Sequence, residues 1–221
     1  LVKNLKEYNV AAFIICPAPG TTPEWVNNLV EQGFPVVHIM REIAGAKVAT
    51  VLPDNFTGTK LATQHLQQKG YKKIAFIGGN ESISDYHQRL SGYTEAMTLA
   101  EMPFSKKLCV QSNTTRNGGR SAMKEALALS ADIEAVVCFS DVIAYGAIEQ
   151  IRAEGKQPGN DIAVIGFDDL EDSRLMSPAL STIHVDANQI AIAVCQILST
   201  IKDGHRNKIL VGVDLIERES S

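Results

Sequence analysis

The chain has 221 residues, of which 45% are hydrophobic and 21% charged, and its formal net charge is −4. This is enough apolar material for one or two buried cores, and the acidic balance offers no basic surface for a nucleic-acid backbone. No apolar run approaches the roughly 20 residues of a membrane span and no signal peptide opens the chain, so we expect a cytoplasmic protein without a membrane partner. Because the first residue is Leu1 and not Met, we expect a fragment of a longer protein.

Short apolar segments rich in β-branched residues alternate with amphipathic segments along most of the chain. The expected strands cover residues 11–16, 35–40, 48–52, 73–79, 107–111, 135–139, 162–167 and 209–217. Most of these segments are continuously apolar and do not alternate with polar residues. That pattern is typical of parallel sheets that are covered on both faces.

Helical segments with recognisable ends lie between these strands. One begins at Thr22, which is followed by Pro23, and ends at Gly33, as the usual capping preferences predict. The other helices are expected over residues 1–9, 54–70, 140–155 and 186–204. Repeated β-α units predict an α/β fold with doubly wound parallel sheets. The early strands are too few for a complete first sheet, so we expect this sheet to be truncated on its N-terminal side.

The sequence carries no motif for metal, nucleotide or nucleophilic chemistry. Its cysteines form no CxxC pair and its histidines form no i, i+4 pair, so we expect no metal site and no cofactor. The "GGN" at residues 78–80 has neither dinucleotide-binding nor P-loop spacing, and GxSxG is absent. We therefore expect a binding protein and not an enzyme. The four cysteines are expected to be buried free thiols; they are Cys16, Cys109, Cys138 and Cys195.

Three polar side chains follow separate predicted strands, at the position where doubly wound sheets bind ligands. Arg89 stands near the start of a predicted helix, Ser140 begins another, and Asp168 comes directly after an apolar strand. A guanidinium donates several hydrogen bonds from a rigid fork, and a carboxylate accepts several. Together they suit vicinal hydroxyls or another small polar effector that is held without reaction.

These charged residues also have simpler interpretations. Arg89 could form a surface ion pair with Asp85 or another acid, and Asp141 could cap its helix. A turn after a strand is normally polar, so the acids that follow Asp168 are expected to be solvated. They are Asp169, Glu171 and Asp172.

Several long segments resemble the lactose/galactose repressor family (LacI/GalR). They are "PVVHIMR" (35–41), "VLPDNFTGTKLATQHLQQKGYKKIAFIGG" (51–79), "SDYHQRLSGY" (84–93), "AVVCFSDVIAYGAIEQIRAEG" (135–155) and "IAVIGFDDLEDSRLMSPALSTIHVD" (162–186). The resemblance covers essentially the whole chain in the family's order. It implies an effector-binding core similar to periplasmic sugar-binding proteins, with two α/β subdomains joined by three crossovers.

In that family a helix-turn-helix headpiece precedes the core. The resemblance implies that the headpiece and the opening strand-helix-strand portion of the first subdomain are missing from this sequence, which agrees with the acidic balance. The crossovers are expected near Pro53, near residues 183–185 and near residues 205–208. The first subdomain would comprise residues 1–53 and 184–206, and the second would comprise residues 54–183 and 207–221.

The resemblance also implies roles for single residues. Arg89 matches the family's effector-gripping arginine in the RLxGY motif, Asp168 matches the acid of the GYDD motif, and Ser140 stands where the family usually has Asn. Met40 stands where the lactose-type repressor has an acid that contacts its sugar. Thr114 stands where family members often have an aromatic residue that stacks on the ligand.

Asp85 and His87, in the segment before Arg89, are candidates to supply polar contacts in place of these lost ones. Pro53, at the first crossover, completes the expected effector-binding set. The effector is therefore expected to be a sugar-like molecule but not a simple galactoside.

The resemblance implies a repressor core that binds a small effector, forms a homodimer and controls operator DNA through the missing headpiece. The segment "DSRLMSPALSTI" (172–183) is apolar for a loop after a strand, and dimer packing is one use for it. A periplasmic sugar-binding protein of a transport system is the alternative, because it has the same two-lobed shape. A small α/β enzyme would need a nucleophile-base pair or a metal cluster, and the sequence has neither.

Overall fold

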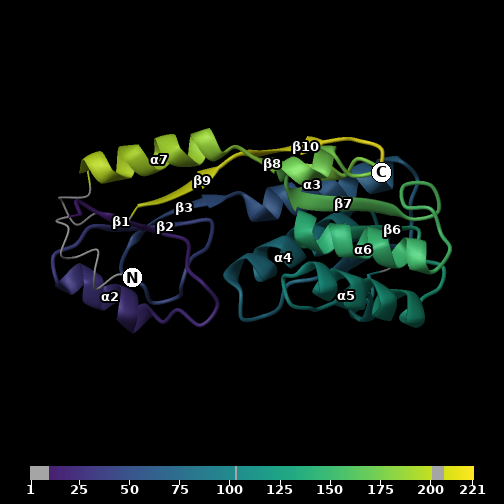
Figure 1. Cartoon of the computed structure of the whole chain (residues 1–221), viewed down its shortest axis with the longest axis horizontal. Helices are drawn as coiled ribbons and strands as arrows, with labels where there is room; N and C mark the ends of the chain where they lie inside the picture. The colour runs from purple at the N-terminus through teal and green to yellow at the C-terminus, as the bar shows by residue number, and fades with distance from the viewer. Residues whose placement is uncertain (1–9, 103, 201–206) are drawn as a thin grey trace. The chain divides into compact units, whose positions relative to one another are not determined.

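The computed structural model describes residues 10–102, 104–200 and 207–221 (Figure 1). The chain divides into two compact units, each made of two segments. The first unit comprises residues 1–54 and 186–212, and the second comprises residues 55–185 and 213–221. The helix expected over residues 1–9 lies outside the described residues, as does the end of the helix expected over 186–204. No helix in the described parts of the chain is long and apolar enough to cross a membrane.

The first unit is built around one parallel sheet. Its elements are β1 (Phe13–Ile15), α2 (Pro23–Glu31), β2 (Val36–Ile39), β3 (Ala49–Pro53), α7 (Ala187–Thr200) and β9 (Lys208–Val211). The strands pair in the order β1-β2-β3-β9, and every pair is parallel. The predicted cap of α2 is confirmed, since the Thr22 side chain accepts a hydrogen bond from the Trp25 backbone N–H at 3.3 Å and Pro23 is the first helical residue.

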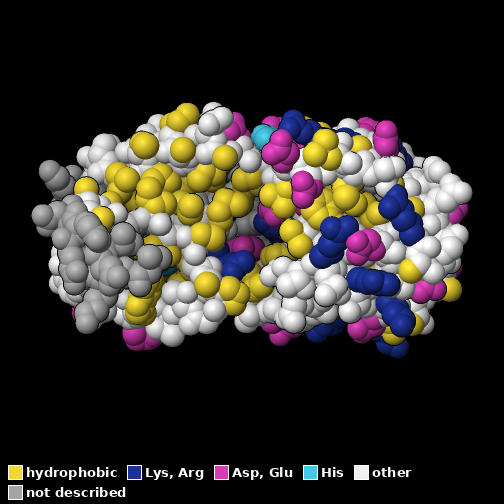
Figure 2. Space-filling view, in the orientation of Figure 1, with side chains coloured by type: hydrophobic (Ala, Val, Ile, Leu, Met, Phe, Trp, Pro, Cys, Tyr) yellow, Lys and Arg dark blue, Asp and Glu magenta, His cyan; other side chains and the backbone are white. Residues whose placement is uncertain are grey.

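The first unit also presents large apolar side chains at its surface. Ile14 of β1, Ile192 of α7 and Leu210 of β9 are 53%, 50% and 54% exposed. Figure 2 shows hydrophobic side chains gathered on the surface of this unit over α7 and β9. Its sheet is therefore not shielded at the edge strands.

The second unit holds a larger mixed sheet. Its elements are α3 (Asn55–Gln68), β4 (Ile74–Ile77), α4 (Ser84–Leu99), β5 (Cys109–Val110), α5 (Arg116–Leu129), β6 (Ala135–Cys138), α6 (Asp141–Ala153), β7 (Ala163–Asp168), β8 (Ser181–Val185) and β10 (Val213–Ile216), with short 3-10 turns at Lys106–Leu108 and Glu171–Arg174. The strand order is β10-β8-β7-β6-β4-β5. All pairs are parallel except β10 with β8.

Helices cover both faces of this second sheet. The chain leaves β4 through α4 toward β5 on one side, and leaves β6 through α6 toward β7 on the other. Right-handed connections that run in opposite directions place their helices on opposite faces. In keeping with this, α3 packs on α4, and α5 packs beside α6 (Figure 1). Strands β4 and β6 are buried along their whole length, as their continuous apolar sequences predict.

The C-terminal strand differs from the prediction. The single strand expected over residues 209–217 is two strands, which Gly212 separates: β9 pairs with β3, and β10 pairs with β8. Residues 208–211 consequently lie in the first unit, whereas the sequence placed residues 207–221 in the second. The reason is that the apolar run continues across Gly212, although the strand that pairs with it changes there. A local sequence pattern does not show which strand a segment pairs with.

The cysteines also differ from the prediction. Cys138 is buried on β6, Cys109 is half-buried, and Cys16 and Cys195 are exposed. Cys195 is exposed because α7 buries its other side, through residues such as Ile190, Val194 and Ile197. The expectation of buried thiols is thus correct for Cys138 and wrong for Cys16 and Cys195.

Candidate functional site

The predicted polar residues of the second unit lie at or beyond the carboxyl ends of three neighbouring strands. β7, β6 and β4 are adjacent in the sheet, and their carboxyl ends lead to Asp168, Ser140 and the helix that carries Arg89. The connections leave β4 and β6 in opposite directions, which makes this edge a topological switch point. In open α/β sheets, ligands bind at such points, outside the carboxyl ends of the strands.

The Arg89 guanidinium is held in one orientation. Its side chain is only 5% exposed, which excludes the interpretation as a surface charge. Nε donates to Asn55 Oδ1 at 2.7 Å, Nη1 donates to the Phe139 carbonyl, and Nη2 lies 3.5 Å from Asp168 Oδ1. Arg89 and Asp168 therefore meet, and the long separation leaves both groups with hydrogen-bonding capacity.

Two aromatic rings lie close to the same guanidinium. Arg89 Cζ lies 3.6 Å from the ring centroid of Phe167 and 4.6 Å from that of Phe139. A cation over an aromatic face gains electrostatic stabilisation, more so where water is excluded. The sequence reasoning missed Phe139, Phe167 and Asn55 as supports of the site. The available signal was that each phenylalanine directly precedes a predicted site residue, in "FSD" and "FDD".

Asp168 is strained and electrostatically perturbed. Its φ is +113°, in a region that side chains other than glycine rarely adopt. Burial raises the pKa of its carboxyl to about 6, against the lowering effect of Arg89, and the carboxylates of Asp141 and Asp85 raise it further. Perturbed acids with a specific charged partner are common in functional sites.

The other predicted residues of the second unit lie on or near α4, α5 and α6. Asp85 is buried in the first turn of α4, where its carboxylate accepts from Ser84 Oγ at 3.1 Å. Ser140 is buried immediately before α6. His87 is exposed, with Nε2 2.9 Å from the Glu81 carbonyl oxygen, and Thr114 is exposed between β5 and α5. The roles of these residues in effector binding remain predictions.

Met40 and Pro53 belong to the first unit. Met40 directly follows β2 and has a φ of +64°, and Pro53 is the buried last residue of β3. Both stand at carboxyl ends of strands, which is where ligand contacts occur in this class of sheet. Their roles also remain predictions.

The acids after Asp168 do not behave alike. Glu171 and Asp172 are exposed, as expected. Asp169 is not solvated: Arg218 Nη2 donates to its Oδ1 at 2.6 Å, and His184 Nδ1 lies 2.9 Å from its Oδ2. The prediction was wrong for Asp169 because both partners come from distant strands, β8 and the segment after β10.

Within the described residues, no group of three or more His, Cys, Asp or Glu side chains is arranged to hold a metal ion.

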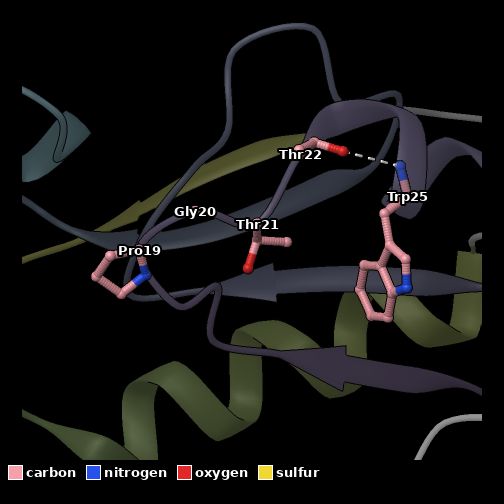
Figure 3. A pocket seen from close by; sticks show the side chains of 5 residues that line it. All are labelled: Pro19, Gly20, Thr21, Thr22 and Trp25. Carbon is pink, nitrogen blue, oxygen red and sulfur yellow. Dashed lines mark hydrogen bonds between the residues drawn. The ribbon is translucent and has the colours of Figure 1, made fainter.

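A hollow in the first unit is separate from these residues. It is lined by Pro19, Gly20, Thr21, Thr22 and Trp25. Figure 3 shows the Thr21 side chain and the Trp25 indole directed to the same side of the loop before α2. None of the predicted site residues lines this hollow.

A family profile described as "Periplasmic binding proteins and sugar binding domain of LacI family" matches residues 2–219. The chain belongs to this family. The match spans both units and includes every residue of the strand-end site, so the resemblance to LacI/GalR regulators is confirmed.

Curated relatives of this LacI-family chain are transcriptional regulators. The probable HTH-type transcriptional repressor ExuR of Bacillus subtilis (strain 168) is 31% identical over 199 residues, which cover 89% of this chain and 60% of that protein. The HTH-type transcriptional regulator GalR of Escherichia coli (strain K12) is 31% identical over 176 residues, which cover 80% of this chain and 51% of that protein. The chain thus spans about half to three fifths of the length of these two relatives.

Solved structures of regulators have the same fold. A complex of the transcriptional regulator CelR with cellobiose has a TM-score of 0.88 at 27% identity and covers 99% of this LacI-family chain and 69% of that one. The transcription regulator CcpA of Lactococcus lactis has a TM-score of 0.88 at 18% identity, which shows the shared fold alone. The predicted class of doubly wound α/β units is therefore confirmed.

Proposed function

We propose that this chain is the effector-binding core of a LacI-type transcriptional repressor and that it senses a small, sugar-like molecule. The observation that carries the proposal is the Arg89–Asp168 pair, which is fixed at the switch point of the second sheet. The relatives that are regulators, and a similar structure described as a cellobiose complex, support the same function.

The chemistry of the pair suits a polyhydroxylated ligand. Arg89 offers N–H donors that Asn55 and the Phe139 carbonyl do not use, and Asp168 offers carboxylate acceptors. Vicinal hydroxyls both accept and donate, so one ligand can bridge the two side chains. Ser140, Asp85, Thr114, Met40 and Pro53 are proposed as further effector contacts.

The wider assignments belong to the same proposal. The protein would act in the cytoplasm as a homodimer, and effector binding would alter operator affinity through a DNA-binding headpiece outside this sequence. Regulators, not enzymes, are its relatives, and these relatives favour the repressor over the periplasmic transport alternative. We assign no cofactor and no catalytic residue.

Calorimetry against a panel of mono- and disaccharides and sugar acids tests the ligand assignment. A hydrogen bond to a charged group contributes about 1.5–3 kcal/mol, so Arg89→Ala is expected to weaken binding at least about tenfold. Arg116→Ala is the matched control, because Arg116 is exposed on α5 and pairs with Glu149. Full affinity in Arg89→Ala would contradict the site, and a wild-type chain that binds none of the panel would contradict the function.

Light scattering tests the dimer. Leu170 and Leu175, which flank the 3-10 turn after β7, are 42% and 73% exposed, and exposed apolar clusters favour association. Leu175→Asp is expected to shift the population toward monomer, whereas Leu129→Asp, a change at the end of α5, is the control with a 51% exposed leucine. Equal molar mass for the wild type and Leu175→Asp would contradict this interface.

A further inference from the structure

One buried carboxylate in the second unit has no part in the expected ligand contacts. Asp141, the first residue of α6, has no exposed surface. Its Oδ2 accepts from the Leu170 backbone N–H at 2.8 Å and from Ser173 Oγ at 2.7 Å, and its Oδ1 accepts from Thr182 Oγ1 at 2.5 Å. All three donors lie outside α6, so this carboxylate does not cap its own helix.

The donors come from three consecutive parts of the chain after β7. Leu170 ends the bend that follows this strand, Ser173 lies in the 3-10 turn, and Thr182 lies in β8. Ser173 Oγ also meets Tyr145 Oη at 2.8 Å, which links the turn to α6 a second time. Asp141 therefore ties the start of α6 to the whole connection between β7 and β8.

The fold leaves room for this carboxylate at one position of β7. A Cβ atom added to Gly166 would collide with Asp141 Oδ1 and would also approach Leu180 Cδ2 to 3.0 Å. Any side chain at position 166 would thus displace the carboxylate. Glycine permits the close approach that the hydrogen bonds require.

The segment that Asp141 holds includes the effector acid. Asp168 and Asp169 have φ values of +113° and +54°, and the next backbone N–H, of Leu170, is bound by Asp141. Backbone in sparsely populated conformations persists only where the surroundings hold it in place. Without the bond to Leu170, the bend can relax and Asp168 can move away from Arg89.

We propose that Asp141 is a positioning residue of the effector site, which fixes the strained bend at residues 168–170 so that the Asp168 carboxylate faces Arg89. The inference rests on the proposed function for its consequence in ligand binding. The positioning of the bend itself does not depend on which effector binds.

Asp141 acts on Asp168 through its charge as well as through the hydrogen bond that holds the backbone at Leu170. The charged groups that influence Asp168 are Arg89 and Asp85 of α4 and Asp141 of α6, and beside it Asp169 is paired with Arg218 and His184. Arg89 lowers the pKa of Asp168, and the two carboxylates of Asp85 and Asp141 raise it. Removing the charge at position 141 should therefore lower the pKa of Asp168, which a purely mechanical support would not do.

Two substitutions at the same position separate these effects. Asp141→Ala removes every acceptor. Asp141→Asn keeps one oxygen that can face Leu170 and Ser173, while its amide can donate to the Thr182 hydroxyl, and it removes the charge. Asp161→Asn is the control, since Asp161 is an exposed carboxylate that accepts from the Gln157 backbone N–H.

The measurements are amide exchange at Leu170, NMR titration of the Asp168 carboxyl and sugar affinity by calorimetry. A free-energy change of about 1.4 kcal/mol alters an equilibrium constant tenfold. Loss of the hydrogen bond to the charged Asp141 should therefore make amide exchange at Leu170 in Asp141→Ala about tenfold faster or more. We expect affinity to fall by a similar factor and to be largely restored in Asp141→Asn. In Asp141→Asn the titration of Asp168 should move to lower pH, and Asp161→Asn should change none of these quantities.

Unchanged exchange at Leu170 in Asp141→Ala, or an unchanged titration of Asp168 in Asp141→Asn, would overturn the inference. If Asp141→Ala does not fold, Thr182→Val takes its place, because it removes one hydrogen bond to the same carboxylate. Faster amide exchange at Leu170 is expected in Thr182→Val, and an unchanged rate would count against the inference. If the wild-type chain binds no sugar, the proposed function fails, and the exchange and titration results still decide the role of Asp141.

Discussion

The two units use the same β-α plan but protect their sheets to different degrees. In the second unit, β4 and β6 are buried at every position and helices cover both faces. In the first unit, β3 is buried at every position, but the two edge strands, β1 and β9, expose Ile14 and Leu210. The edge strands of the second unit, β5 and β10, expose only the polar Asp214. The strand-end acids and the arginine of the candidate site stand on the better-packed unit, which favours a fixed geometry for them.

The helices of the second unit pack so closely that three of their glycines admit no side chain. In the second unit, a Cβ added to Gly92, Gly119 or Gly146 would collide with the backbone of a neighbouring helix. Helix backbones therefore touch in the second unit and leave no space for a methyl group.

Gly146→Ala is expected to have the largest effect on stability. Its new methyl group would collide with the Arg116 carbonyl of α5, and overpacking of this kind costs on the order of 3 kcal/mol. Urea denaturation followed by circular dichroism measures the loss. Gly212→Ala is the control, expected to change stability by less than about 0.5 kcal/mol because nothing lies within 4 Å of the added atom. Equal urea midpoints for Gly146→Ala and Gly212→Ala would contradict the close packing of α5 on α6.

His38 is expected to make the first unit sensitive to acid. It is fully buried on β2, neither ring nitrogen has a hydrogen-bond partner within the described residues, and burial lowers its pKa below 6.5. The unfolded chain therefore binds a proton near pH 6.5 that the folded unit does not. Stability is retained above that pH and lost as the pH falls toward the lowered pKa, by up to about 1.4 kcal/mol per pH unit.

Trp25 is the single tryptophan of the chain and lies in the first unit, so its fluorescence reports this unit. Urea titrations at pH 7.5 and pH 5.5 should show a loss of stability in the wild type that His38→Leu largely abolishes. The same pH dependence in both proteins would show that another group in the first unit is responsible.

Removing an exposed ion pair is expected to have the smallest effect on stability, and the effect should be the same in the two units. Lys208 pairs with Glu42 at 2.8 Å in the first unit, and Lys60 pairs with Glu95 at 2.7 Å in the second. Surface pairs contribute about 0–1 kcal/mol, so Glu42→Gln and Glu95→Gln should each shift the urea midpoint only slightly. A large loss for one of them alone would reveal a difference between the units that packing does not explain.

The sequence predicted what depends on local pattern. Continuous apolar runs predicted the central strands, and Thr22 with Pro23 predicted the start of α2. The same local patterns predicted that Ser140 and Asp168 lie at strand ends, while their role in effector binding stays a prediction. All of these are set by residues a few positions apart.

The sequence did not predict what depends on a distant partner. Residues 209–217 were predicted as one strand because both halves are apolar, although one half pairs with β3 and the other with β8. Asp169 read as a solvated turn residue because Arg218 is far away in the sequence. Asp141 read as a helix cap because capping is the commonest use of an acid at that position, and its donors lie 29 to 41 residues away.

The joints between the units are unusually short. Asp54 alone separates β3 from α3, Asp186 alone separates β8 from α7, and Gly212 alone separates β9 from β10. Each residue contributes two freely rotating backbone angles, φ and ψ. Any rotation of one unit against the other must therefore be shared among these few angles, in three chain segments that turn at the same time. A single proline at position 212 would remove one of these freedoms, so it would restrict any such rotation without a change at the strand-end residues.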